Sequence, residues 1–230
     1  MNRMVDLATS YGASVARLGA GLNALPPLKR PKKLLELYEF EACPFCRKVR
    51  DALTELDLDA MIHPCPKGGK RFRPKVKKAG GKEQFPYLVD PNTGKAMYES
   101  DDIVRYLYTT YAGRKPNPRL VGPLATISSQ VASVWRPTSG ARVKFSRAPK
   151  EPLELYSFEA SPYCRIARET LCELEIPYVL HNVGKGSPGR DAFAKRSGKM
   201  QVPYLIDPNT GKEMFESAEI RDYLLKTYSL

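Results

Sequence analysis

Two cysteines at Cys43 and Cys46 are the residues of this chain best suited to chemistry. They frame the motif Cys-Pro-Phe-Cys, which follows a strand-like alternating run and opens a segment predicted to be helical over residues 44–56. Only a thiolate attacks a disulfide, and an ordinary cysteine with a pKa of ~8.5 is mostly protonated at neutral pH. A helix N-terminus favours the anion through its free N–H groups and its dipole. Cys43 is therefore the candidate nucleophile, and the less exposed Cys46 is the candidate resolving thiol.

The second half of the chain repeats the first and lacks one of the two sulfurs. Residues 35–46 read LELYEFEACPFC and residues 153–164 read LELYSFEASPYC, so Ser161 replaces the first cysteine and Cys164 matches the second. QFPYLVDPNTGK and YESDDIVRYL are answered in the same order by QVPYLIDPNTGK and FESAEIRDYL. The chain is therefore a tandem duplication of two units. Because a serine hydroxyl cannot form a disulfide, the second unit should not carry out dithiol chemistry.

The elements that must position these residues follow one order in both units. A strand leads into each four-residue motif and a helix follows it; a second strand, a short helix, two strands and a final helix come next. Asp-Pro-Asn-Thr-Gly, which joins the later two strands, is strong turn chemistry. The final helix of the first unit begins with Ser100 as N-cap and has Asp101 and Asp102 in its first turn, where acids suit the helix dipole. This order, βαβ-α-ββα, predicts an α/β fold.

An amphipathic helix is predicted in front of each unit. The segment from Leu7, LATSYGASVARLG, resembles the segment from Leu124, LATISSQVASVWRP, and both carry apolar residues at helical spacing. These residues are Val5, Ala8, Tyr11, Val15 and Leu18 in the first segment, and Leu124, Ile127, Val131 and Val134 in the second. The predicted domains are residues 1–33, the leading helix and a basic Pro-rich segment; 34–113, unit one; 114–152, the junction and the second leading helix; and 153–230, unit two.

Composition predicts a soluble globular protein in a reducing compartment. No apolar run reaches the ~18 residues that a membrane span needs, so no transmembrane segment is expected. Five cysteines form an odd set in a chain without a secretory signal, which argues against a disulfide scaffold. Residues 1–30 resemble an organelle transit peptide in composition. Because a similar segment recurs before unit two, we expect folded structure there.

The formal net charge of +12 is unevenly distributed. Residues 67–82, KGGKRFRPKVKKAGGK, contain basic residues and no acid. Three interpretations stay open for this segment: a solvated face, an anion pocket for a carboxylate-bearing ligand, or a nucleic-acid patch. A nucleic-acid groove also needs aromatic residues between the charges, and Phe72 alone provides little of this, so nucleic acid is not an expected partner.

A zinc site is the main alternative use of the two cysteines. His63 and Cys65 follow Cys43 and Cys46, which would complete a set of three cysteines and one histidine. However, His63 is matched by His181 in the unit that lacks those cysteines. We therefore expect a structural histidine at a strand end and no metal site.

These ordered motifs resemble the thioredoxin-like fold in its glutaredoxin and glutathione-transferase N-terminal form. The resemblance covers residues 34–112 and 153–228, and such tandem proteins are similar to chloroplast proteins, which implies the chloroplast stroma. Two features depart from it. No all-helical C-terminal domain follows either unit, so a transferase's electrophile pocket has no evident source. Phe40 stands where glutaredoxins usually have a lysine.

The resemblance implies glutathione as co-substrate and a set of residues that hold it. The prolines before the third strand would be cis and would turn the preceding backbone toward the ligand. The Glu-Ser pairs would bind the γ-glutamyl group at a helix N-terminus, and Lys70, Arg71 or Arg73 would meet the glycyl carboxylate. In unit one these residues are Phe85, Pro86, Glu99, Ser100 and Arg71; in unit two they are Val202, Pro203, Glu216 and Ser217, beside Ser161 and Cys164.

The predicted function is a glutathione-linked thiol–disulfide oxidoreductase that acts through Cys43 on protein disulfides or glutathionylated thiols. It requires the Cys43 sulfur to be ionised and reachable at neutral pH. Unit two would hydrogen-bond a glutathione thiolate through Ser161, bind without chemistry, or serve as a scaffold. Two other classes stay open: a non-catalytic protein that binds glutathione or a peptide, and a carrier of a metal or an iron–sulfur cluster on Cys43.

Overall fold

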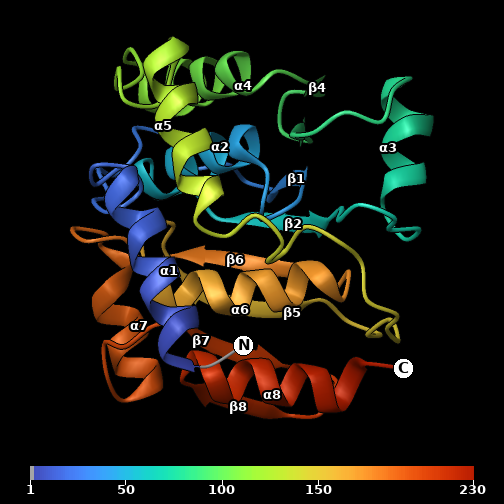
Figure 1. Ribbon diagram of the computed structural model, residues 1–230. Helices are drawn as coiled ribbons and strands as arrows, with labels where there is room; N and C mark the ends of the chain where they lie inside the picture. The colour runs from blue at the N-terminus through green and yellow to red at the C-terminus, as the bar shows by residue number, and fades with distance from the viewer. Residues whose placement is uncertain (1–2) are drawn as a thin grey trace.

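Both units lie in one eight-stranded sheet in the computed structural model, which describes residues 3–230 (Figure 1). The elements of unit one are β1 (Leu35–Glu39), α2 (Pro44–Glu55), β2 (Ala60–Pro64), α3 (Arg73–Gly80), β3 (Tyr87–Asp90), β4 (Lys95–Met97) and α4 (Ser100–Leu107), which continues as the π-helical turn η1 (Tyr108–Ala112). Those of unit two are β5 (Leu153–Ser157), α6 (Pro162–Glu173), β6 (Tyr178–Asn182), α7 (Gly189–Ser197), β7 (Tyr204–Asp207), β8 (Lys212–Phe215) and α8 (Ser217–Tyr228). The predicted order βαβ-α-ββα is confirmed in both units.

The sheet runs across the boundary between the units. Its strand order is β4-β3-β1-β2-β6-β5-β7-β8. Within each unit the first two strands are parallel and the later two are antiparallel to their neighbours, while β2 and β6 pair antiparallel with Ala60 opposite Leu180. Alternation along β1 and β5 buries every second residue, and one hydrophobic core contains side chains of both units. The two copies are therefore halves of one continuous sheet and core.

Each leading helix packs against the unit that it does not precede in the sequence. Helix α1 (Arg3–Ala16) packs against α6 of unit two, and α5 (Gly122–Val134) packs against α2 of unit one; α1 and α5 also pack against each other (Figure 1). Each helix thus covers the motif of the other unit. None of the helices in the described part of the chain has the length and hydropathy of a membrane span.

Both predicted helices form, but their apolar residues face outward. Val15 is 71 % exposed and Leu124 is 81 % exposed. The buried sides consist of small and polar residues: Asp6, Ser10, Ala13 and Arg17 on and after α1, and Ala125, Ser129, Ala132 and Arg136 on and after α5. The reason is that these sides satisfy the backbone of the motif loops, since the Ser10 hydroxyl donates to Pro162 O at 2.8 Å and the Ser129 hydroxyl donates to Pro44 O at 2.6 Å.

The equivalent positions of the two helices also differ from the sequence match. Ser10 corresponds to Ser129, because each donates to the proline of the opposite motif. Arg17 donates to Ala125 O at 2.9 Å, and Arg136 donates to Asp6 O at 2.7 Å. The alignment of Leu7 with Leu124 is therefore wrong by two residues. The residues that are equivalent in the two helices are those that make the same hydrogen bonds, not those with the same apolar side chain.

The two histidines lie in β2 and β6, as expected of structural residues. His181 contacts Asp59 at 3.1 Å and Glu154 at 2.9 Å, and His63 contacts Glu36 at 3.1 Å. Burial lowers the pKa of His181, but the two carboxylates raise it and leave it above its ordinary value. Burial lowers the pKa of His63, and its single carboxylate does not offset this.

The two histidines should therefore contribute to stability with opposite pH dependence. A raised folded-state pKa stabilises the protein fully below the unfolded pKa of ~6.5, and this contribution is lost as pH rises through the folded pKa. The loss of unfolding free energy in His181→Gln should consequently be larger at ~pH 5 than at ~pH 9. His63→Gln is the matched control, and its loss should be larger at the higher pH. Urea unfolding at both pH values measures this, and equal pH dependence in the two variants would refute the assignment.

Candidate functional site

The Cys43 sulfur lies at the N-terminus of α2. Cys43 is the N-cap residue, Pro44 begins the helix without losing a hydrogen bond, and the Cys46 N–H donates to Cys43 Sγ at 3.3 Å. A strand end followed by a helix start leaves N–H groups free at this point. The arrangement directs backbone donors at the one sulfur that the motif places outside the helix.

The environments of the two thiols drive their pKa values apart. Burial raises the pKa of Cys43, but the Cys46 thiol and then the N–H groups of Cys46 and Phe45 lower it, and the net result is a pKa below the ordinary value. Burial and the neighbouring Cys43 sulfur raise the pKa of Cys46 well above its ordinary value. Cys43 is therefore the thiol that ionises first.

Both cysteines are more enclosed than the expectation of a reachable Cys43 required. Cys43 retains 3 % exposure and Cys46 none. Helix α5 closes the motif, because the Ser129 hydroxyl binds Pro44 O and the Ser133 hydroxyl donates to Ala42 O at 3.1 Å. The sequence could not show this cover, since it comes from the leading helix of the other unit.

An aromatic wall lies beside the loop that leads into the motif, where the Cys43 N–H donates to Phe40 O at 3.1 Å. The Phe85–Pro86 and Val202–Pro203 bonds are cis, as the resemblance implied. The Phe40 and Phe85 rings meet edge to face with centroids 6.2 Å apart. The Arg73 guanidinium carbon lies 4.7 Å from the Phe85 ring centroid. A cation and two aromatic rings therefore line this part of unit one.

Arg71 does not belong to this wall. Its guanidinium crosses to unit two and donates to Leu174 O at 3.1 Å and to Ser146 O at 3.1 Å. Burial lowers its pKa. The prediction of Arg71 as a carboxylate ligand in unit one is thus wrong, because backbone carbonyl groups outside that unit hold its guanidinium. The nearby Arg73 is the basic residue beside Phe85.

The two Glu-Ser pairs begin the last helix of each unit in a strained conformation. Glu99 has φ of 64° and Glu216 has φ of 65°, which non-glycine residues rarely adopt. Such residues concentrate at functional sites. Gln84 Nε2 donates to Glu99 Oε1 at 2.6 Å, and Gln201 repeats this with Glu216 at 2.5 Å. Sequence reasoning missed the two glutamines, although both stand in the repeated QFP and QVP segments.

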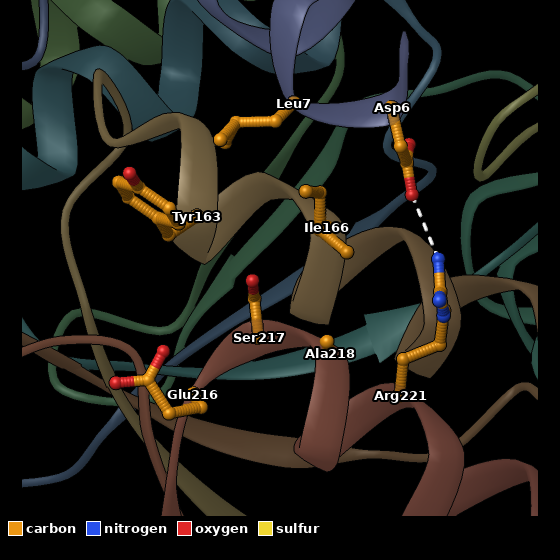
Figure 2. A pocket seen from close by; sticks show the side chains of 8 residues that line it. All are labelled: Asp6, Leu7, Tyr163, Ile166, Glu216, Ser217, Ala218 and Arg221. Atoms are coloured by element: carbon orange, nitrogen blue, oxygen red, sulfur yellow. Dashed lines mark hydrogen bonds and ion pairs between the residues drawn. The ribbon is translucent and has the colours of Figure 1, made fainter. Parts of the chain in front are cut away.

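A cavity lies over the equivalent site of unit two. It measures about 300 Å³ and is lined by Tyr163, Gln201, Val202, Pro203, Glu216 and Ser217, so four predicted site residues come together there. A second cavity of about 250 Å³ shares Tyr163, Glu216 and Ser217 with it and extends to Asp6 of α1 and Arg221 of α8 (Figure 2). The Arg221 and Asp6 side chains form an ion pair at 2.8 Å at its end. Unit two therefore has an open polar site that includes a residue of α1.

Ser161 and Cys164 are not among the residues that line these cavities. Ser161 is the N-cap of α6, and its hydroxyl oxygen accepts the Cys164 N–H at 3.2 Å. Ser161 is 4 % exposed and Cys164 is fully buried. The serine thus occupies the structural place of Cys43 and performs a capping role.

The remaining cysteines are buried parts of the packing. The Cys65 thiol donates to His63 O at 3.3 Å, and the Cys172 thiol on α6 donates to Gly140 O at 3.3 Å. Burial raises the pKa of both. Within residues 3–230, no three His, Cys, Asp or Glu side chains form a group that could hold a metal ion. The zinc alternative therefore gains no support.

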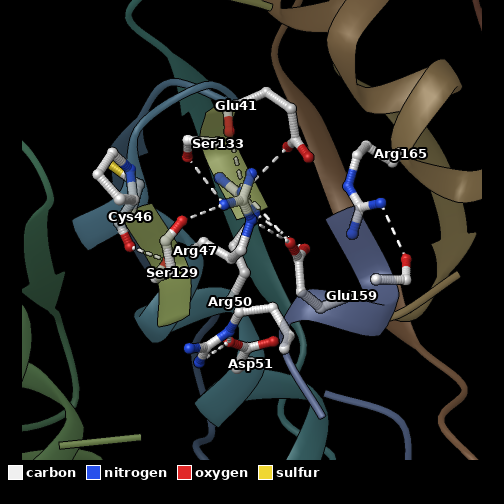
Figure 3. A network of polar contacts seen from close by, with 12 residues as sticks. Glu41, Cys46, Arg47, Arg50, Asp51, Ser129, Ser133, Glu159 and Arg165 are labelled. Atoms are coloured by element: carbon white, nitrogen blue, oxygen red, sulfur yellow. Dashed lines mark hydrogen bonds and ion pairs between the residues drawn. The ribbon is translucent and has the colours of Figure 1, made fainter. Parts of the chain in front are cut away.

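A buried ionic network connects the two motifs. Glu159 follows β5 and pairs with Arg50 of α2 at 2.9 Å (Figure 3). Glu41 follows β1 and pairs with Arg168 of α6 at 3.1 Å. All four side chains are 1–2 % exposed. Arg47 of α2 also lies near Glu159, at 3.8 Å. The repeated glutamates stand two residues before each motif, a signal that sequence reasoning passed over. This reciprocal pairing fixes the two motif loops against each other.

The comparisons with known proteins identify the family. The family described as "Glutathione S-transferase, N-terminal domain" matches residues 37–115 and residues 155–230, which together span more than half of the chain. The chain belongs to this family. It is a tandem pair of glutathione S-transferase N-terminal domains, and the resemblance of its motifs to this domain is confirmed. None of the curated proteins compared with the chain matches it significantly.

Solved transferase structures resemble parts of this tandem N-terminal-domain protein. A glutathione transferase of Bombyx mori is 27 % identical over 40 % of this chain and 44 % of its own, with a TM-score of 0.31. A trimeric glutathione transferase of Leishmania is 13 % identical over 86 % of this chain and 68 % of its own, also with a TM-score of 0.31. This chain thus matches less than half of the length of the silkworm protein.

Proposed function

We propose that the protein is a glutathione-linked thiol–disulfide oxidoreductase that works through Cys43. The observation that carries the proposal is the position of Cys43 Sγ, which accepts the Cys46 N–H at 3.3 Å and has a pKa below its ordinary value despite burial. Membership of a glutathione transferase domain family supports glutathione as the thiol partner. Burial raises the pKa of Cys46, Cys65 and Cys172, whereas the pKa of Cys43 lies below its ordinary value.

The proposed reaction consists of two thiol–disulfide exchanges, and each exchange breaks one disulfide bond and forms another. The Cys43 thiolate attacks the glutathione sulfur of a mixed disulfide, so that a Cys43–glutathione disulfide forms and the substrate thiolate leaves and takes up a proton. A second glutathione thiolate then attacks the bound glutathione sulfur, which releases oxidised glutathione and restores the Cys43 thiolate. In the net reaction, one mixed disulfide and one glutathione thiol become one substrate thiol and one oxidised glutathione, so the disulfide bond passes from the substrate to glutathione.

Glutathione would lie along the aromatic wall formed by Phe40 and Phe85. We assign its cysteinyl main chain to the backbone of Phe85, beside Pro86. The γ-glutamyl ammonium goes to Glu99, and the γ-glutamyl carboxylate goes to Ser100 and the N–H groups at the start of α4. Arg73 replaces Arg71 as the cation for the glycyl carboxylate, since it lies 4.7 Å from the Phe85 ring.

The enclosure of Cys43 limits the substrates. With 3 % of the residue exposed, a disulfide inside a folded protein cannot approach its sulfur without displacing neighbouring side chains. Glutathionylated small thiols and flexible peptides should therefore react faster than structural disulfides. We also propose the chloroplast stroma as the compartment, which a fluorescent fusion of the full chain would test.

The direct test is turnover of a mixed disulfide between glutathione and 2-mercaptoethanol. The purified protein, supplied with glutathione, should accelerate its reduction, and oxidised glutathione should accumulate at the same rate. The rate should saturate with the mixed disulfide. A rate no greater than that of glutathione alone would refute the proposal.

A second function, glutathione binding without chemistry in unit two, is favoured by the cavity there. Val202, Pro203, Glu216 and Ser217 line it, and the first turn of α8 carries one acid, whereas the first turn of α4 carries Asp101 and Asp102. Fewer acids leave the helix N-terminus more favourable to a carboxylate. Calorimetry with S-methylglutathione, which cannot exchange, should show two sites, and Ser217→Ala should weaken the one that Ser100→Ala leaves intact. Binding that Ser217→Ala does not weaken would contradict a site in unit two.

A further inference from the structure

Two adjacent helices present a row of apolar side chains to solvent. We define the outward face as Val15, Leu18, Leu124, Ile127, Val134 and Trp135. Each of these side chains is between 52 % and 81 % exposed. They recur at helical spacing, which is the stripe that a globular protein normally turns to its core. Exposed apolar patches of this kind mark interaction sites.

The outward face is one continuous surface. Helices α1 and α5 pack against each other. The Trp135 ring lies over Gly12 of α1, because a Cβ atom placed on Gly12 would come within 2.8 Å of it. The indole thus bridges from the end of α5 to α1, and the two stripes form a single patch.

The helices cannot turn this stripe inward, since their other sides are already in use. Arg17 and Arg136 are buried and donate to the backbone of the opposite helix at 2.9 Å and 2.7 Å. Ser10 and Ser129 donate to the motif prolines. Rotating either helix would leave buried polar groups without partners, so the apolar side must find its cover outside this chain.

The charges of the two helices and of the whole chain indicate what kind of surface would cover the outward face. Helix α5 contains no charged residue, and the single acid of α1, Asp6, is buried and paired with Arg136 at 2.5 Å. Arg119 lies at the edge of the face, where it donates to Leu18 O. The whole chain carries +12, so an anionic surface attracts it, whereas a second copy would repel it.

We propose that the outward face docks on a lipid membrane with anionic headgroups. Its aliphatic side chains suit the acyl boundary, because leucine and valine seldom anchor protein interfaces. A tryptophan beside aliphatic residues is typical of surfaces that lie in the headgroup region, and a positive net charge strengthens binding to anionic lipid. This inference is independent of the chemistry at Cys43.

The single tryptophan of the chain, Trp135, lies in the face and provides the readout. The probe is vesicles of phosphatidylcholine mixed with phosphatidylglycerol, compared with vesicles of phosphatidylcholine alone. The protein should sediment with the anionic vesicles, and its tryptophan emission should shift to shorter wavelength. Binding should weaken as salt screens the charges.

The variant that tests the face is Val15→Glu combined with Leu124→Glu. Both side chains are more than two-thirds exposed, so folding should be preserved, and partition onto anionic vesicles should fall by about tenfold or more. Leu28→Glu combined with Phe145→Glu is the control, since it makes the same charge change at residues that are 83 % and 82 % exposed outside the face. Both double variants lower the net positive charge equally, so any weakening from charge alone is the same in both. Beyond that equal effect, the control should bind anionic vesicles as tightly as the unchanged protein does.

Three results would overturn the proposal. The first is no sedimentation with either vesicle, and the second is equal binding by the two double variants. The third is a dimer in sedimentation velocity without lipid that Val15→Glu with Leu124→Glu dissolves, which would assign the face to a second copy of the chain.

Discussion

Cys43→Ser should lower the glutathione-dependent reduction of a mixed disulfide by ~10³-fold or more, because the substitution removes the nucleophile. Ser161 shows that a hydroxyl fits this N-cap position, since it accepts the Cys164 N–H at 3.2 Å in unit two. The variant should therefore keep its fold, and circular dichroism and melting temperature would verify this. The loss would then report chemistry rather than unfolding.

Cys164→Ser and Cys46→Ser are the matched controls for Cys43→Ser. Cys164 is fully buried in the unit without a nucleophile, so Cys164→Ser should leave turnover unchanged. Burial keeps the pKa of Cys46 high, so a second glutathione should resolve the intermediate, and Cys46→Ser should retain most of the activity. Loss of activity in Cys46→Ser equal to that in Cys43→Ser would instead indicate a dithiol route. Unchanged turnover in Cys43→Ser would refute the role of this residue.

Glu159→Gln should destabilise the whole chain by about 3–5 kcal/mol. The Glu159 carboxylate lies 2.9 Å from Arg50 Nε and 2.8 Å from Arg168 Nη2, with 2 % of its side chain exposed. Its removal leaves two buried guanidinium groups of different units without this counter-charge. Because the sheet and core are continuous, both units should unfold in one transition at lower denaturant concentration.

The effect of Glu159→Gln should also depend on pH. Burial raises the pKa of Glu159, but Arg168 and Arg50 lower it to about 2. A depressed pKa stabilises the fold above the unfolded value of ~4.3, and this contribution is lost as pH falls toward the folded value. The difference between the protein and Glu159→Gln should therefore shrink below ~pH 4.

The control for this charge change is Asp102→Asn on the surface. Asp102 is 68 % exposed and lies 3.5 Å from Arg105, so its loss should change stability by less than ~1 kcal/mol. Equilibrium urea unfolding measures both variants. Two separate transitions, or equal small effects in the two variants, would contradict the assignment of one cooperative body.

The elements and motifs of this fold are predictable because they depend on local patterns. Alternation in LELYE and LELYS indicates β1 and β5, and the proline of each motif begins α2 and α6. The tandem match fixed the equivalence of Ser161 with Cys43. Each of these signals lies within about a dozen residues of the structure that it predicts.

The errors concern contacts between the units, which local patterns do not encode. The inward sides of α1 and α5 are polar because Ser10 and Ser129 bind carbonyl groups in the opposite unit. Arg71 donates to Leu174 O, whereas Arg73, two positions later, faces Phe85. The enclosure of Cys43 has the same origin, since α5 belongs to the other copy. These features depend on the pairing of β2 with β6, for which the sequence carries no short-range sign.

The measurement that tests the account most directly is the rate of Cys43 alkylation by iodoacetamide as a function of pH, followed by mass spectrometry of the native protein. We expect Cys43 to react in the folded state, with a midpoint below the ~8.5 of an ordinary thiol, while the buried Cys65 and Cys172 stay unmodified. Labelling of Cys43 only after unfolding, or a midpoint at or above that value, would contradict the central claim that this sulfur is a reachable thiolate at neutral pH.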